Sequence, residues 1–209
     1  MKFKYKSLVL AMMACGLLHE AQAANGLETL DNGLPSNIGV GVFGMSRDAS
    51  VVVGAVRLDP YNYRAYVFSG GTSRELAGPA GDTQVIAQSA SGNGQVVVGW
   101  SSKTTSRALV WEGSGYSELP HLGTTIQSSQ AYAVSDDGNV VAGFSFSSSG
   151  YAGAMHAVRW LRTAGVWASP EDLNGGDFVS SRATAMDANG NTVVGYVGTA
   201  GYSEQAFRW

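Results

Sequence analysis

Three carboxylates, Glu112, Asp177 and Glu204, stand outside the motifs that recur along this sequence. Acid/base hydrolysis of a glycosidic bond needs two carboxyl groups that converge in one cleft. Their spacing along the chain does not show such convergence. A carbohydrate-active hydrolase with carboxylates on its loop face is therefore the alternative hypothesis for function. We predict that the chain is not an enzyme, with no catalytic residue.

Residues that could ligate a metal are equally sparse. After residue 23 the only histidines are His121 and His156, and the single cysteine, Cys15, precedes them, so a zinc site has too few ligands. His156 occupies a repeat position that elsewhere holds arginine or glutamine and is predicted to be solvated. The acidic turns at 136–139 and 187–191 lack the bidentate glutamate and further oxygen ligands of a calcium loop. We predict no metal and no cofactor.

Aromatic residues concentrate in the segments that vary most between the repeats. These segments are rich in Ser, Gly and Asn, and they would gather on one rim if the repeats surround an axis. Such a surface suits a glycan or a protein ligand. The predicted ligand-facing residues are Tyr61, Tyr63, Phe146, Tyr151 and Tyr202.

Two motifs recur four times and must position all of these residues. In the first, Asp or Asn stands six residues before a glycine that closes a short, mostly β-branched segment. The glycines are Gly54, Gly99, Gly143 and Gly195, spaced 45, 44 and 52 residues apart. In the second motif an alanine stands three residues before a large aromatic, which is Phe68, Trp111, Trp160 and Trp209 in turn.

These motifs predict short strands. β-Branched residues favour strands and Asp/Asn-Gly pairs favour tight hairpin turns, whereas 28 glycines argue against long helices. The closing glycine predicts a bulge or a close backbone approach. Four short antiparallel strands per unit indicate an all-β, β-propeller-like array of four repeats, with small residues at the axis and the tryptophans between blades. The repeat cores are about 42–68, 87–111, 131–160 and 183–209.

The order of the elements leaves the closure of the array open. A match to the fourth strand at 28–30 comes first, and the third strand comes last, at 206–209. A first strand that completes the last blade would close a four-bladed ring without a free edge. A piece of a longer array is the alternative, and a β-solenoid is disfavoured because its rungs usually repeat at shorter periods.

The N-terminus is predicted to be a signal peptide spanning residues 1–23, followed by the repeat domain at 24–209. Lysines precede an apolar run of about 11 residues, well short of the roughly 20 that a spanning helix needs. Small residues predict cleavage between Ala23 and Ala24. Lipidation of Cys15 is the alternative, although methionine stands where the lipobox has leucine.

The composition argues against nucleic acid as a partner, and against a transmembrane helix and disulfides in the mature chain. The formal net charge is −3 at pH 7, and only one lysine follows the signal peptide, so no electropositive surface for nucleic acid is expected. No later segment has the length and apolarity of a transmembrane helix. Without a cysteine in the mature chain, no disulfide is expected despite the predicted export.

The motif A-x-A-V-S-x-D-G-N-V-V-x-G followed by A-x-R-W resembles the HAF family of extracellular repeats. Residues 131–143 and 157–160 are the most similar copy, and the first copy departs from it at Ala49 and Phe68. The resemblance implies a Gram-negative bacterial protein, extracellular or on the outer-membrane surface, with the periplasm as alternative. Proteins of this family often form autotransporter passengers, and if this chain is a fragment of one, a translocator domain is an expected partner. The expected function is a secreted or surface-displayed, non-enzymatic interaction or adhesion module.

Overall fold

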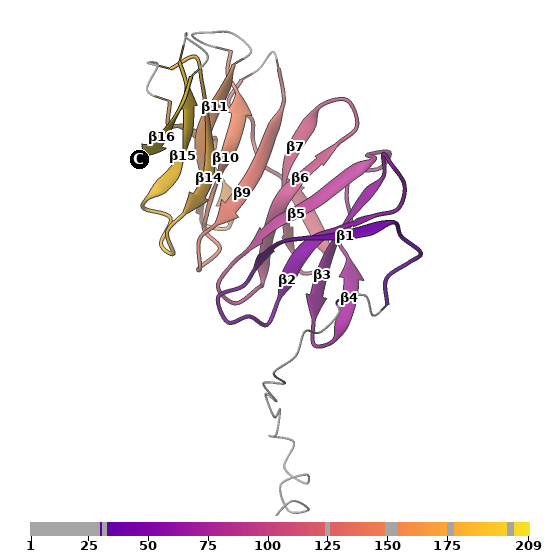
Figure 1. Cartoon of the computed structure of the whole chain (residues 1–209). Coiled ribbons are helices and arrows are strands. Elements are labelled where there is room, and N and C mark those ends of the chain that lie inside the picture. Colours follow the sequence, from indigo (N-terminus) through magenta and orange to yellow (C-terminus); the bar gives the residue numbers. More distant parts are fainter. Residues whose placement is uncertain (1–29, 31–32, 124–125, 149–153, 175–177, 200–202) are drawn as a thin grey trace, which may run out of the picture.

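The computed structural model describes residues 30, 33–123, 126–148, 154–174, 178–199 and 203–209. Within these residues the chain folds into sixteen β-strands joined by turns and loops (Figure 1). The strands pair in four consecutive antiparallel units, blades 1 to 4, which confirms the predicted all-β, β-propeller-like array of four repeats. The predicted signal peptide, with Ala23 and Ala24, lies outside the described residues and stays a prediction.

Blades 1 and 2 are four-stranded meanders in which each strand pairs with the next along the chain. Blade 1 comprises β1 (Gly39–Met45), β2 (Val52–Arg57), β3 (Tyr63–Ser69) and β4 (Thr72–Glu75). Blade 2 comprises β5 (Gln84–Ala90), β6 (Val96–Ser102), β7 (Ser106–Glu112) and β8 (Gly115–Glu118). One parallel bridge, between Tyr63 and Gln84, joins the two blades.

Blades 3 and 4 vary this plan. Blade 3 comprises β9 (Ser129–Val134), β10 (Val140–Phe146), β11 (Met155–Thr163), β12 (Val166–Trp167) and β13 (Glu171–Asp172). Its outer strand is interrupted, because β12 and β13 pair with different parts of β11. Blade 4 shows three strands within the described residues: β14 (Ser180–Met186), β15 (Val193–Gly198) and β16 (Glu204–Arg208).

Every blade carries a β-bulge where its innermost strand pairs with the second strand. The bulge lies beside the glycine that closes the first motif. A Cβ built on Gly54, Gly99, Gly143 or Gly195 would lie 2.0 Å from a carbonyl oxygen of the inner strand. The predicted close backbone approach at these glycines is therefore confirmed, because no other residue leaves room for that carbonyl.

Adjacent blades pack face to face through small and β-branched side chains. Trp111 and Trp160 lie between the blades with 2% and 0% of their surface exposed. The Trp111 indole N–H donates to the Ala77 carbonyl (2.6 Å), and that of Trp160 donates to the Pro120 carbonyl (2.8 Å). Both acceptors belong to the connection that leads into the tryptophan's blade, so each indole ties its blade to that segment. The predicted wedging of tryptophans between blades is confirmed for Trp111 and Trp160, whereas Trp209 in blade 4 is 41% exposed.

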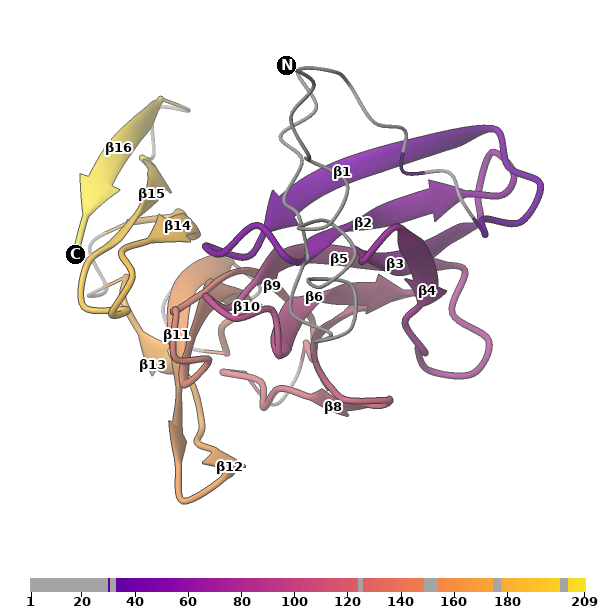
Figure 2. The same ribbon diagram turned by 90° about the horizontal axis from the view of Figure 1, so that it is seen from below.

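The four blades form an open arc (Figure 2). The innermost strands β1, β5, β9 and β14 contact one another in sequence order, while the outer strands β8 and β12 lie at the periphery. β1 and β14 share no comparable set of contacts in the described parts of the chain. The four-bladed ring is therefore not closed, and blades 1 and 4 each present a face that no neighbouring blade covers.

Candidate functional site

The strand directions give the array two faces. The turns between first and second strands, and between third and fourth strands, lie on the turn face. The connections between second and third strands, and between blades, lie on the opposite loop face. Backbone hydrogen bonds join the turns of adjacent blades: the Gly92 N–H donates to the Asp136 carbonyl (2.9 Å), and the Asp136 N–H donates to the Ala188 carbonyl (2.8 Å).

A serine and an acidic or amide residue build the turn between the first two strands in blades 1 to 3. In blade 3 the Ser135 hydroxyl donates to Asp137 (2.6 Å) and accepts the Val140 N–H (3.0 Å). Ala49 replaces the turn glycine in blade 1 yet keeps a left-handed φ of 57°, compared with 74° at Gly138. The side chains thus satisfy the backbone of their own turns, which is the hairpin chemistry expected from the sequence.

The turn carboxylates should make the fold sensitive to acid. Hydrogen bonds from Ser135 and from the Asn139 N–H lower the pKa of Asp137 below its ordinary value of 3.8. A pKa that is lowered in the folded state adds stability above the unfolded-state pKa, and this stability is lost as the pH falls through the folded-state pKa. Asp137→Asn, which copies Asn93 of blade 2, should therefore reduce the drop in melting temperature on acidification below about pH 4.

The measurement is circular dichroism melting at neutral and acidic pH for both proteins. Asp48 and Asp187 keep their own lowered pKa values, so the variant should retain part of the acid response. An acid response identical to that of the wild type would contradict the role given to Asp137.

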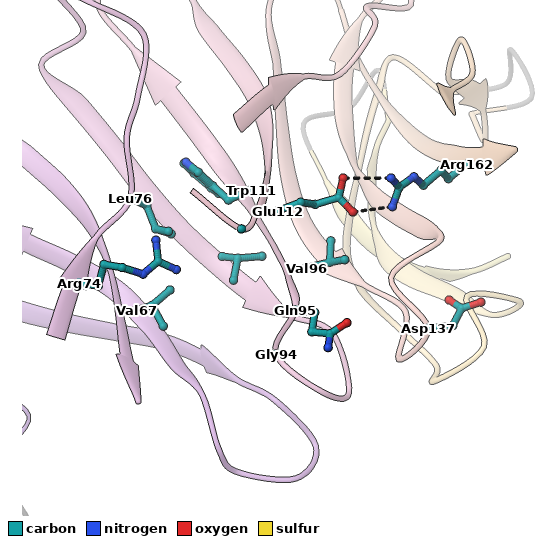
Figure 3. Close-up of a pocket in the computed structure, with 12 residues that line it drawn as sticks. Val67, Arg74, Leu76, Gly94, Gln95, Val96, Trp111, Glu112, Asp137 and Arg162 are labelled. Atoms are coloured by element: carbon teal, nitrogen blue, oxygen red, sulfur yellow. Dashed lines mark hydrogen bonds and ion pairs between the residues drawn. The ribbon is translucent and has the colours of Figure 1, made fainter. Parts of the chain in front are cut away.

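The described surface has a cleft on the turn face, at the junction of blades 1, 2 and 3. It encloses about 520 Å³ (Figure 3). Its apolar wall is formed by Val67, Leu76 and Trp111, which are buried at the blade 1–blade 2 contact. Figure 3 shows Arg74 on one side of the cleft and the paired Glu112 and Arg162 on the other. The cleft therefore combines an apolar wall with charged side chains at its rim.

The charges on the rim are not all neutralised. The Arg162 guanidinium donates two hydrogen bonds to the Glu112 carboxylate (2.5 and 3.0 Å) and lies 5.7 Å from the Trp167 ring centre. The Asp137 carboxylate accepts hydrogen bonds within its own turn. Arg74 is exposed and has no ion-pair partner among the described residues. The cleft lining therefore holds two arginines and two carboxylates, of which Arg74 and Asp137 have no ion-pair partner among the described residues.

The predicted ligand-facing residues that the structure describes, Tyr61, Tyr63 and Phe146, lie away from this cleft, on the loop face. Tyr61 is 76% exposed, on a loop in which Asp59 accepts the Tyr61 N–H (2.9 Å). Tyr63 is half-buried and lies under the Arg57 guanidinium (5.8 Å), and Phe146 packs edge-on against Phe144 (6.0 Å). Tyr63 and Phe146 belong to blades 1 and 3, so the structure does not bring them together.

Tyr151 and Tyr202 lie outside the described residues, so the five aromatics stay a prediction as a group. Arg74 and Arg162 were not singled out from the sequence. Neither arginine belongs to a motif that recurs in all four repeats. Glu112, which pairs with Arg162, was noted in the sequence only as a candidate carboxylate for the hydrolase alternative.

The carboxylates considered for hydrolysis do not converge. Glu112 ends β7 on the turn face, whereas Glu204 begins β16 on the loop face. Asp177 lies outside the described residues. Because Glu112 is held by Arg162, Glu112 and Glu204 do not form the pair of free carboxylates that glycoside hydrolysis uses.

His156 is not the solvated residue that the sequence predicted. It is 4% exposed, and its Nδ1 lies 2.8 Å from the Asp172 carboxylate. In blades 1 and 2 the equivalent arginines face the equivalent carboxylates at 3.8 and 3.7 Å, so a pair at this position links the third and outer strands in blades 1 to 3. In the described residues no three His, Cys, Asp or Glu side chains form a group that could hold a metal ion.

No protein-family model and no curated protein sequence matches this chain. Its structure is similar to that of TolB from Acinetobacter baumannii, with a TM-score of 0.60 and 15% identity over 84% of this chain and 42% of that chain. Putative TolB from Agrobacterium tumefaciens gives a TM-score of 0.55 and 12% identity over 82% and 58%. A post-proline cleaving enzyme from Rickettsia typhi gives 0.51 and 11% over 81% and 27%.

The chain spans less than two thirds of each of these proteins, and identities this low establish the fold alone. Across the described residues, no helix has the length and apolarity needed to cross a bilayer. The pairing of the strands and the structural similarity together show an all-β chain with the β-propeller fold.

Proposed function

We propose that this protein is an exported, non-enzymatic interaction module that binds a partner polypeptide in the turn-face cleft. The predicted signal peptide and the resemblance to HAF repeats support export and display at the bacterial surface, as in an autotransporter passenger. The separation of Glu112 from Glu204 gives no support to the hydrolase alternative.

The observation that carries the proposal is Arg74, which lies beside the apolar wall of Leu76 and Trp111 and has no ion-pair partner among the described residues. Binding sites combine apolar walls with a few placed polar groups that orient the ligand. An arginine that faces a carboxylate makes charge-assisted, frequently bidentate hydrogen bonds. The cleft therefore suits an extended segment that carries a carboxylate next to an apolar side chain.

An array of peptides that pair acidic with apolar residues, compared with basic peptides of equal hydropathy, tests the proposal. The purified exported protein should prefer the acidic set. Arg74→Glu should weaken binding at least about tenfold, because a charge-assisted hydrogen bond contributes about 1.5–3 kcal/mol and 1.4 kcal/mol is a factor of ten. Lys103→Glu makes the same charge change on the loop face and should leave binding unchanged.

Two results would contradict the assignment to the cleft. Equal losses of peptide affinity in Arg74→Glu and Lys103→Glu would show that binding depends on the net charge of the protein and not on the cleft. Binding of a glycan or peptide that Tyr61→Ala abolishes and Arg74→Glu spares would move the site to the loop face.

A further inference from the structure

The innermost strand of blade 1 exposes side chains that the other blades bury. Val42 is 52% exposed, whereas Ala87, Ala131 and Ala183, its equivalents in blades 2 to 4, are 0% exposed. Val40 and Met45 point to the same side of β1 and are 42% and 64% exposed. These three residues form what we call the leading face, the side of blade 1 on which a preceding blade would pack.

Blade 4 exposes the opposite side of the same repeat. Val194 is 38% exposed, whereas its equivalents Val53, Val98 and Ala142 are each 0% exposed. Ala206 is also exposed, although the alanine at that position is fully buried in the other three blades. Val194 and Ala206 form the trailing face, on which a following blade would pack.

The internal contacts show what each face binds. Val53 shares a core cluster with Ala87, Val98 shares one with Ala131, and Ala142 shares one with Ala183. Three times over, a trailing-face residue of one blade packs against the inner-strand residue of the next. Val194 and Val42 are the two members of this series that no neighbouring blade covers.

A chain of backbone hydrogen bonds across the turns stops at the same two ends. The Asp48 N–H donates to the Gly92 carbonyl (3.2 Å), and the series continues from Gly92 to Asp136 and from Asp136 to Ala188. Within the described residues the Ala188 N–H donates to no further blade, and the Arg47 carbonyl accepts from none. The series thus leaves one unused donor, the Ala188 N–H at the trailing face, and one unused acceptor, the Arg47 carbonyl at the leading face.

We propose that the leading face of one molecule packs against the trailing face of a second copy of this chain. The contact repeats the inner-strand part of the three internal blade contacts, with Val42 of one copy beside Val194 of the other and the Ala188 N–H directed at the Arg47 carbonyl. Farther out on the same side of blade 1, Tyr66 and Phe68 are already covered by Leu34 of the same chain. A head-to-tail contact closes a ring when its rotation allows. Two copies would supply eight blades, which is within the usual range for propellers.

Variants that introduce a charge on one face at a time test this contact. Val42→Arg disables only the leading face and Val194→Glu only the trailing face. By size-exclusion chromatography with light scattering and by native mass spectrometry, the purified exported chain should be a dimer and each single variant a monomer. An equimolar mixture of the two variants should form a heterodimer, because one contact is intact and the other joins introduced charges of opposite sign.

Val166→Arg is the matched control, because Val166 is 69% exposed on β12, away from both end faces. It should leave the dimer intact, and circular dichroism should show that every variant is folded. A larger head-to-tail assembly that both substitutions abolish would support the same contact. A wild-type monomer throughout a dilution series, or a dimer that persists in both single variants, would overturn it.

Discussion

Gly143→Ala should lower the free energy of unfolding by about 3 kcal/mol or more, a large effect for one methyl group. The added Cβ would lie 2.0 Å from the Gln130 carbonyl oxygen and 3.0 Å from the Ala131 Cα. Both are backbone atoms of the bulged inner strand, so no side-chain rotation relieves the clash. The strands would have to separate, and the contact of β9 with the neighbouring blades would be lost. Urea denaturation followed by tryptophan fluorescence measures this change.

Gly115→Ala is the control for this experiment. Gly115 also lies in a strand, and a Cβ added there meets nothing within 4 Å. Its free energy of unfolding should stay the same or rise by up to about 1 kcal/mol, because alanine restricts the unfolded chain. Equal losses in both variants would show that the bulge geometry is not what requires glycine at position 143.

Trp160→Ala should lower the free energy of unfolding by about 3–5 kcal/mol. The ring is 0% exposed within the core between blades 2 and 3, and its N–H is the donor to the Pro120 carbonyl (2.8 Å). The substitution leaves a cavity and removes the tie to the inter-blade connection. Chemical denaturation should show a lower midpoint.

Trp209→Ala is the matched control because Trp209 holds the same repeat position in blade 4. It is 41% exposed and stacks under the Arg159 guanidinium at 4.2 Å. The expected loss is about 1–2 kcal/mol from partial burial and a cation–π contact. Trp160→Phe, which copies Phe68 of blade 1, should fall between the two, because it keeps an aromatic ring in the core but loses the N–H and part of the indole's volume. Equal losses at Trp160 and Trp209 would contradict the role of burial.

Local chemistry explains why several features were predictable. The hairpin turn at Asp137 and Gly138 depends on neighbouring residues alone. Asp137 accepts a hydrogen bond from Ser135 of the same turn, and Gly138 supplies the left-handed backbone conformation that the turn needs. Gly143 indicates a close approach because only glycine tolerates it. Four copies of each pattern then made the blade architecture predictable, and blades 1 and 2 have the four strands expected of each repeat.

Features that depend on neighbouring blades were not predictable. His156 was expected in solvent but is buried, because the Asp172 carboxylate in β13 lies beside it. The interruption of the outer strand of blade 3 between β12 and β13 left no repeat signal. The cleft combines Arg74 of blade 1, Glu112 of blade 2 and Arg162 of blade 3, which are far apart in sequence and outside the repeat columns.

The amino-acid sequence alone determined the four repeats, their strands and turns, and the glycines at the bulges, because these follow from short-range stereochemistry. Only the tertiary structure decided that the arc stays open and which carboxylates are paired, since both depend on how the blades are placed. The carboxylates outside the repeats illustrate this: Glu112 is neutralised by Arg162, while Glu204 lies on the opposite face. Spacing along the chain carries no information about which groups meet across blades, so the candidate cleft could be located only from the fold.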